Sequence, residues 1–203
     1  MKAINIFILA VIIFYSNISF SRSGREKNPI YEVGITYAAL ADAGIVHFGI
    51  DGAASYESEK AQIIGLNVAS TLNRWLEFET GLEYGKYRFR VAPNIGPGVP
   101  VNFSSVNAEL LTIPVTVRAV FRKFFFINAG GLLGIHVANP KEPSNQSGLG
   151  LMAGLGARYS FKNGLTLMIN PYVRLHGLLR FGKAQNGEYL LENGIRLGVG
   201  YRF

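Results

Sequence analysis

The feature of this sequence that most constrains its fold is an alternation of apolar and polar residues with a period of two, which begins at Tyr31 and continues to the last residue. Such a period is typical of a β-strand with one apolar face. The final segment shows it most clearly, because Leu197, Val199 and Tyr201 share one face while glycine and arginine occupy the other. Eight segments of this kind follow one another, each about 10 to 15 residues long, so the chain is predicted to be all-β.

The length of these segments favours a sheet that spans a membrane. Strands of soluble proteins average about 5 to 6 residues, whereas a tilted strand needs about 9 to 11 residues to cross a bilayer. A sheet in lipid must close on itself to pair its backbone, and bacterial single-chain barrels have an even number of strands. A charged fraction of only 16%, with 24 glycines, suits a lipid-facing surface. The predicted fold is an eight-stranded antiparallel up-and-down transmembrane β-barrel.

The residues of the polar face decide which side of this barrel points inward. A soluble barrel of the lipocalin kind would hold the Leu, Ile, Val and aromatic face inside. An eight-stranded interior is just wide enough to be filled by side chains, and glycines opposite arginine and glutamate would fill it. We therefore expect the polar face inside.

Charges in a narrow, dry interior must be paired. The sequence therefore predicts a structural ion-pair network inside the barrel, made of Glu77, Glu79, Glu83, Arg118, Arg158, Arg174 and Arg196. Glu32 is also expected inside. Because six inward arginines outnumber four inward glutamates, we expect the surplus arginines, Arg180 and Arg202, near the rims where water reaches them.

The first 21 residues have a different character from the rest. Lys2 is followed by an almost unbroken apolar run and then by the small residues Ser19 and Ser21. One positive charge, roughly a dozen apolar residues and a small-residue cleavage site are typical of a secretory signal peptide. The run is shorter than the ~20 residues of a spanning helix. We predict a cleaved signal peptide at residues 1–21 and an outer-membrane barrel domain at residues 22–203.

The connections between the segments alternate in length. Short turns at 73–75, 122–123 and 162–164 alternate with longer links at 41–60, 92–103, 139–147 and 182–188. Outer-membrane barrels have short periplasmic turns and longer extracellular loops. Both termini are therefore predicted to lie in the periplasm of a Gram-negative bacterium.

Two groups of residues refine this expectation. Aromatic residues gather at both predicted rims, with Trp75 near the short turns and Phe89 near the long links, as an interfacial girdle should. Pro114 and Pro171 lie inside predicted strands, where proline cannot donate to the ladder. We expect a local bulge at each proline.

Short motifs along the chain resemble the PorT-like family of outer-membrane barrels. Residues 109–115 (Glu-Leu-Leu-Thr-Ile-Pro-Val) resemble the family's fourth strand, in which an aromatic or aliphatic run leads into an Ile-Pro pair. Residues 129–131 (Ala-Gly-Gly) and 198–203 (Gly-Val-Gly-Tyr-Arg-Phe) are similar to its fifth and last strands. The resemblance covers the whole mature chain. It implies an OmpA/OmpX-like eight-stranded barrel, roles that range from the type IX secretion apparatus to unassigned, and no catalytic residues.

The end of the chain suggests one partner. Tyr201 and Phe203, after a run of alternating apolar residues, resemble the C-terminal signal that outer-membrane barrels present to their insertion machinery. We therefore expect the barrel-assembly machinery as a partner during insertion. Outer-membrane lipid and lipopolysaccharide would surround the barrel, and a protein partner would meet its loops or its periplasmic rim.

The candidates for chemistry are few. The absence of cysteine removes thiolate zinc sites and cysteine nucleophiles. Glu77 and Glu79 could form an acid–base pair, but an ion-paired lumen explains them as well. His136 and His176 are expected on strands that are not neighbours, with no third ligand in view. We predict no catalytic residue, no cofactor and no metal.

These considerations lead to one leading function and two alternatives. The net charge of +7 could suggest nucleic acid, but many arginines are assigned to the interior and no aromatic RNA platform is present. The leading hypothesis is a non-enzymatic membrane anchor or interaction scaffold, including an accessory role in a type IX-like secretion complex. A small passive pore and a lipid-modifying outer-membrane enzyme are the alternatives.

Overall fold

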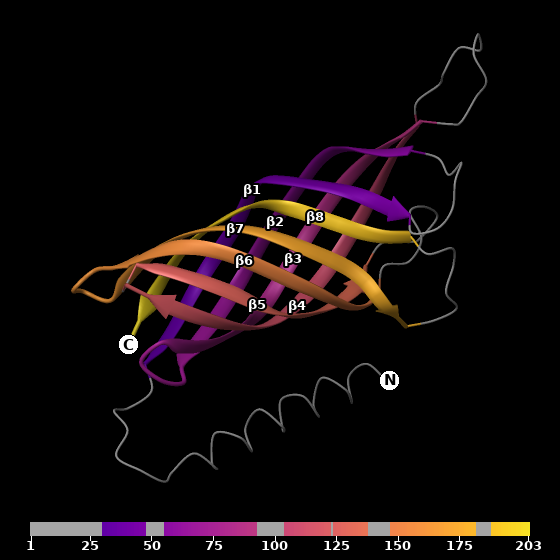
Figure 1. Cartoon of the computed structure of the whole chain (residues 1–203). Coiled ribbons are helices and arrows are strands. Elements are labelled where there is room, and N and C mark those ends of the chain that lie inside the picture. Colours follow the sequence, from indigo (N-terminus) through magenta and orange to yellow (C-terminus); the bar gives the residue numbers. More distant parts are fainter. Residues whose placement is uncertain (1–29, 48–54, 93–103, 123, 138–146, 182–187) are drawn as a thin grey trace.

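The computed structural model of the chain is a closed β-barrel (Figure 1). It describes residues 30–47, 55–92, 104–122, 124–137, 147–181 and 188–203, so the predicted signal peptide lies outside the described residues. Within them, no helix is long and apolar enough to span a membrane. The strands are β1 (Tyr31–His47), β2 (Ser55–Thr71), β3 (Leu76–Ala92), β4 (Ser104–Phe121), β5 (Phe125–His136), β6 (Gly148–Ser160), β7 (Leu165–Arg180) and β8 (Glu188–Arg202).

Each strand pairs antiparallel with the next along the chain, and β8 pairs with β1 to close the barrel. This confirms the predicted fold. The strands are longer than the sequence suggested, at 12 to 18 residues. The largest difference lies between β1 and β2, because much of the expected link at 41–60 belongs to these two strands.

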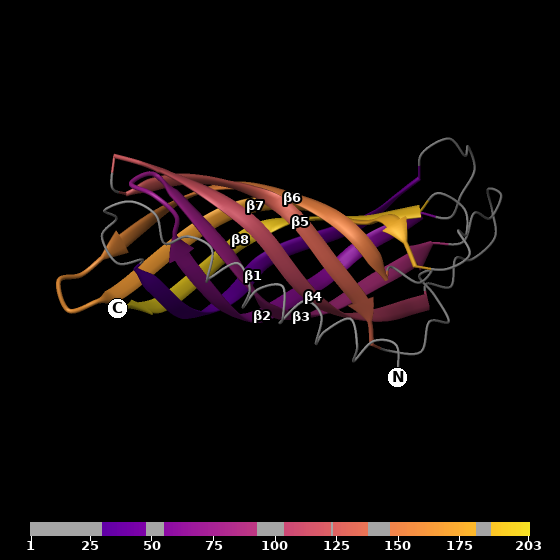
Figure 2. The ribbon, with the colours of Figure 1, turned by 90° about the horizontal axis from the view of Figure 1, so that it is seen from below.

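The apolar face of the sheet points outward. Side chains alternate between buried and exposed along the described parts of the strands, and most of the exposed set is apolar, with Leu66 59% and Leu155 64% exposed. The buried set contains most of the charged strand residues whose side chains are described, including Arg118 and Glu79. This arrangement is the inverse of a soluble barrel and excludes the lipocalin-like alternative. Figure 2 shows the barrel from below, with the strands strongly tilted to its axis.

The stagger of the strands sets the tilt. Following paired residues once around the barrel from Val33 leads back to β1 at Gly44, eleven residues further along. One of these eleven is the extra residue of a bulge between Ala38 and Asp42. The remaining stagger is even, so inward side chains meet inward side chains when the barrel closes. Strands in closed barrels tilt by ~35–45°.

The two prolines do not produce bulges, contrary to the expectation. The pairing register is unbroken on both sides of Pro114 and Pro171. At Pro171 the side chain of the preceding residue replaces the missing donor, because Asn170 Nδ2 donates to the carbonyl of Leu155 at 2.9 Å, directly opposite the proline. At Pro114 the Thr80 hydroxyl donates to the proline carbonyl at 2.8 Å. At Pro171 a local side chain thus supplies the donor that the proline lacks.

Two neighbouring glycines in β5 show why an inward position of this strand requires glycine. A Cβ on Gly130, which faces the interior, would lie 2.1 Å from the carbonyl oxygen of Val115 in β4. A Cβ on Gly131, which faces outward, would have only the carbonyl oxygen of Gly150 near it, at 3.9 Å. Glycine at 130 therefore allows a close backbone approach, and it leaves interior volume for the long side chains described below.

Candidate functional site: the closed interior

The interior of the barrel contains a connected network of ion pairs, which begins at the end with the short turns. There, Arg158 of β6 forms a two-pronged contact with Glu77 of β3, at 2.6 and 2.9 Å. Arg202 of β8 donates to the same carboxylate at 2.8 Å. Glu32 of β1 lies 3.8 Å from Arg158 and 3.4 Å from Arg202. Four strands are therefore joined by charge at this rim.

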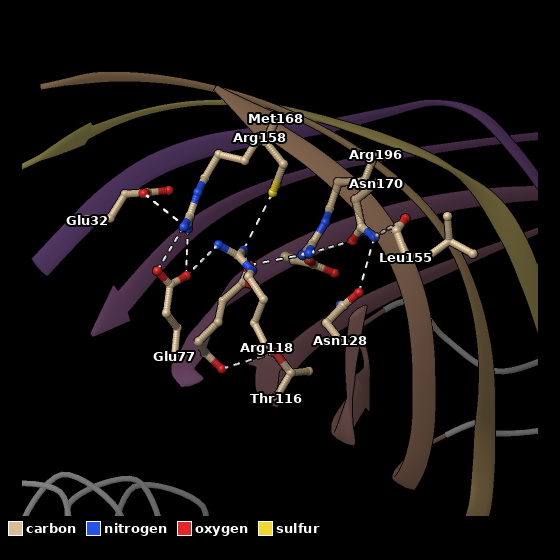
Figure 3. Close-up of polar contacts among 12 residues, drawn as sticks. Glu32, Glu77, Thr116, Arg118, Asn128, Leu155, Arg158, Met168, Asn170 and Arg196 are labelled. Carbon is tan, nitrogen blue, oxygen red and sulfur yellow. Dashed lines mark hydrogen bonds and ion pairs between the residues drawn. The ribbon is translucent and has the colours of Figure 1, made fainter. Parts of the chain in front are cut away.

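The middle of the network centres on Arg118 of β4, whose side chain is fully buried. Its guanidinium contacts the carboxylates of Glu79 and Glu77 and lies 4.6 Å from the centroid of the Phe126 ring. Arg196 of β8 lies 3.3 Å from Glu79 on its other side. Figure 3 shows Arg118, Arg158 and Arg196 converging on these acidic groups from different strands. A guanidinium over an aromatic ring gains cation–π attraction when it is desolvated.

The network continues toward the other end of the barrel through Glu83 of β3. Arg196 lies 3.3 Å from Glu83, and Arg174 of β7 lies 2.6 Å from it. Arg174 also contacts Glu192 of β8 at 3.5 Å. The Glu192 carboxylate accepts a hydrogen bond from the Tyr87 hydroxyl at 2.6 Å.

His176 of β7 ends this series of contacts. Its Nε2 lies 3.0 Å from the Glu192 carboxylate, and both side chains are buried. The contacts thus run without a break from Glu32 at one rim to His176. Acidic and basic groups alternate along the way, so each buried charge has an opposite charge beside it, as burial requires.

All seven residues of the expected network lie in this one connected cluster. They are Glu77, Glu79, Glu83, Arg118, Arg158, Arg174 and Arg196. Glu192 was not among the expected network residues, although it lies on the same face of β8 as Arg196, four residues before it. With Glu32, Glu192 and Arg202 included, the described part of the network has five glutamates and five arginines, so these groups are balanced in charge.

The two arginines expected near the rims differ from each other. Arg202 lies at the rim with its side chain 23% exposed, but it is paired with both Glu32 and Glu77 rather than left in surplus. Arg180 of β7 lies with its guanidinium 5.8 Å from the centroid of the Tyr189 ring. Glu192 was left out of the expected set of inward glutamates, and for this reason the expected surplus of arginine was larger than the surplus in the structure.

Apolar side chains fill the interior beyond the network, toward the long links. Tyr87 and Phe89 of β3 stack there with ring centroids 6.4 Å apart, against Leu110 of β4 and Leu190 of β8. Phe89 was expected in an outward girdle, but its side chain is fully buried. This apolar cluster covers the network, so the charged groups below it are shielded from water on that side.

Side chains leave little free space in the described interior. A cavity of about 10 Å³ lies beside Glu32 and Asn67, near the short-turn rim. This is room for about one water molecule. Arg118 and Glu79 are almost inaccessible to solvent, whereas a water-filled channel along the barrel axis would wet them. The described residues therefore close the interior at its middle.

The histidines do not assemble a site in the described part of the chain. His176 is buried against Glu192, and His136 lies on β5, which is separated from β7 by β6. Among the described residues, no three metal-ligating side chains come together. Glu77 and Glu79 are each held by two or more arginines, so they belong to the ion-pair network rather than to an exposed acid–base pair.

The fold and its interior define a closed, eight-stranded antiparallel β-barrel with an apolar outer surface and an ion-paired interior. No known protein family and no curated protein sequence matches the chain. Among solved structures, it is similar to the outer membrane protein OprG from Pseudomonas aeruginosa, with 13% identity, a TM-score of 0.51, and coverage of 89% of this chain and 98% of that one. The likeness to OprG shows the fold.

Two further structures match with lower scores. Ail, the attachment invasion locus protein of Yersinia pestis, has 14% identity and a TM-score of 0.41 over 87% of this chain and 100% of its own. The N-terminal barrel domain of Pseudomonas aeruginosa OprF has 15% identity and a TM-score of 0.40 over 88% of this chain and 100% of its own.

Proposed function

We propose that this chain is a non-enzymatic, integral β-barrel of the bacterial outer membrane that serves as a membrane anchor and interaction scaffold. The single observation that carries the proposal is an apolar outer surface around an interior closed by paired charges. The outward face is mostly apolar over residues 64–72, which comprise the end of β2 and Leu72 just beyond it, and over residues 76–84 of β3. Each range has nine residues, which matches the ~9–11 that a tilted strand needs to cross a bilayer.

The closed interior argues for a scaffold over the two alternatives. A passive pore needs a continuous water path, and the buried Arg118 and Glu79 occupy the position where it would run. A lipid-modifying enzyme needs catalytic groups that lipid can reach, and the His176–Glu192 pair is buried in the interior. A role in a type IX-like secretion complex, and membership of the PorT-like family, stay predictions that rest on the sequence resemblance alone.

The proposal includes an orientation in the membrane. The C-terminus lies at the barrel end that carries the β2–β3 and β6–β7 turns (Figure 1). The β2–β3 turn is held tightly, because Asn73 Oδ1 accepts hydrogen bonds from the backbone of Trp75 and Leu76 at 3.0 and 2.8 Å. Short, rigid turns are typical of the periplasmic end of outer-membrane barrels. We place both ends of the mature chain in the periplasm, after removal of residues 1–21.

Single-cysteine labelling tests the location and the orientation together, since the chain has no cysteine of its own. Asn107→Cys puts a thiol on an exposed position of β4 at the long-link end, and Lys162→Cys puts one in the β6–β7 turn. On intact cells, a membrane-impermeant maleimide should label the cysteine at 107 and leave that at 162 unlabelled until the outer membrane is permeabilised. Labelling of 162 alone would reverse the orientation, and recovery of the chain outside the outer-membrane fraction would contradict the location.

The last residues support a proposal about assembly. Phe203 is 68% exposed on the outer surface of the rim, close to Tyr201 on the same face. Its backbone also exchanges two hydrogen bonds with Tyr31 of β1, at 2.9 and 3.0 Å. We propose that the exposed aromatic pair is the signal read by the barrel-assembly machinery, in addition to the part that the Phe203 backbone takes in closing the β1–β8 seam.

A further inference from the structure

The pattern of the barrel wall inverts along three neighbouring strands. In β3, the inward side chains change from Glu79 and Glu83 to Tyr87 and Phe89, while the outward side chains change from apolar to Lys86 and Arg88. Strand β4 changes in the same way and at the same level of the wall, as does β2. The inward side chains there become Ala108 and Leu110 in β4 and Ala61 and Ile63 in β2, and the outward ones become Asn107 and Glu109 in β4 and Gln62 in β2.

This inversion marks the place where the wall leaves the bilayer. An apolar interior with a polar exterior is the arrangement of a protein in water, and the reverse is the arrangement in lipid. Leu82 is the last aliphatic side chain of the outward apolar stretch of β3, and Tyr84 is the aromatic residue at its end. Tyrosine is enriched at the level of the headgroups. The residues directly beyond Tyr84 therefore lie beside the headgroups of the leaflet at the long-link end.

The outward residues at this level form a polar cluster on β3 and β4. Tyr84 donates to the Glu109 carboxylate at 2.7 Å, and the same carboxylate lies 3.8 Å from Lys86 Nζ. Arg88 Nε donates to Asn107 Oδ1 at 3.4 Å. Lys86 is 61% exposed, and its loose ion pair with Glu109 is of a kind that contributes little to stability.

Lys86 and Arg88 stand on the same face of one strand, so their stems are roughly 6.5 Å apart. With Glu109 included, the cluster carries a net positive charge. Among the described residues, the Arg88 guanidinium uses one of its five donors, on Asn107, and the Lys86 ammonium carries three donors. Both groups bind phosphate: a guanidinium through several hydrogen bonds at once, and an ammonium as a point charge.

We propose that Lys86 and Arg88, supported by Tyr84 and Asn107, bind a phosphate group of lipopolysaccharide in the outer leaflet. The site rests on the proposed location and deepens it by naming the lipid headgroup that the barrel wall contacts. The source of the phosphate is a lipid because the cluster continues directly from the apolar surface that ends at Leu82. A lipid bound there would place its acyl chains on that surface and its phosphate on the two cations.

The test measures lipid A binding to the full-length barrel in zwitterionic micelles by native mass spectrometry. The double variant Lys86→Ala with Arg88→Ala should bind lipid A roughly 25-fold more weakly than wild type, because each basic residue near an anionic headgroup contributes about five-fold. The matched control Arg74→Ala with Lys162→Ala removes two exposed cations from the opposite end and should bind like wild type. The exchange of Lys86→Arg with Arg88→Lys should keep most of the binding.

Two ligand controls identify the chemistry. Dephosphorylated lipid A should bind wild type as weakly as lipid A binds the double alanine variant, and inorganic phosphate should neither bind measurably nor compete. Equal lipid A binding by the double variant and the matched control would overturn the site, as would binding that does not depend on the phosphates. Competition by inorganic phosphate would overturn the lipid source. Fractionation of wild type tests the location separately, so a barrel that binds lipid A through Lys86 and Arg88 but fractionates elsewhere contradicts the location and not the site.

Discussion

Glu79→Ala should lower the free energy of unfolding of the barrel by ~3–5 kcal/mol, because removing one partner of a buried pair strands the other charge. Two arginines depend on this carboxylate: Arg118, which is fully buried, and Arg196, 3.3 Å away. Denaturant titration of the barrel in micelles measures the loss. The fluorescence of Trp75, the only tryptophan, reports the transition.

Two controls separate charge from other effects of this substitution. Asp42→Ala removes an exposed carboxylate from the same barrel and should change stability by less than about 1 kcal/mol. Glu79→Gln keeps the side-chain volume but removes the charge. If the loss of charge is the cause, this variant should show most of the decrease in unfolding free energy that Glu79→Ala shows. Combining Glu79→Gln with Arg118→Met removes both charges, and the double variant should be more stable than the sum of the two single losses predicts. Additive losses would contradict a coupled network.

Phe203→Ala should reduce the amount of assembled, heat-modifiable barrel in cells several-fold. The substitution removes the exposed ring but keeps the backbone that exchanges hydrogen bonds with Tyr31. The purified variant should therefore refold into micelles with a yield close to that of wild type, since refolding in vitro needs no assembly machinery.

Deletion of Phe203 provides the comparison. It removes the ring together with both hydrogen bonds of the β1–β8 seam, so it should impair assembly in cells and lower stability in vitro. If Phe203→Ala assembles like wild type while the deletion fails, the residue acts only by closing the seam, and the proposed insertion signal is wrong.

The number of strands, their pairing order and their inward face could be predicted from the sequence. Side chains alternate between the two faces of a strand, and only the apolar face can lie against lipid while the polar face lies inside the barrel. The seven network residues were found for the same reason. Glu192 was not, although its spacing from Arg196 puts it on the inward face. The bulges expected at Pro114 and Pro171 were wrong. At Pro171 the Asn170 side chain donates to the carbonyl opposite the proline, and this contact depends on the register between strands.

A shift in the alternation has two causes that the sequence does not separate. In β1, the inward residues change from even to odd numbers after Ala38 because a bulge adds one residue. In β3, the polar residues change from odd numbers, as in Glu83, to even numbers, as in Lys86, although no bulge interrupts the pairing between these two residues. There the backbone is regular and the surroundings change from lipid to water. The burial of Phe89 in the interior distinguishes the change of surroundings in β3 from the bulge in β1.

The most direct test of a closed barrel is the conductance of the purified wild-type protein in a planar lipid bilayer. Arg118 and Glu79 fill the middle of the interior, and Tyr87, Phe89, Leu110 and Leu190 cover it toward the long links. Folded barrels, verified by heat-modifiability before insertion, should therefore show no steady open-channel current under conditions in which a porin of the same preparation conducts. A stable, ohmic conductance from the wild-type barrel would contradict the closed interior and favour the passive pore.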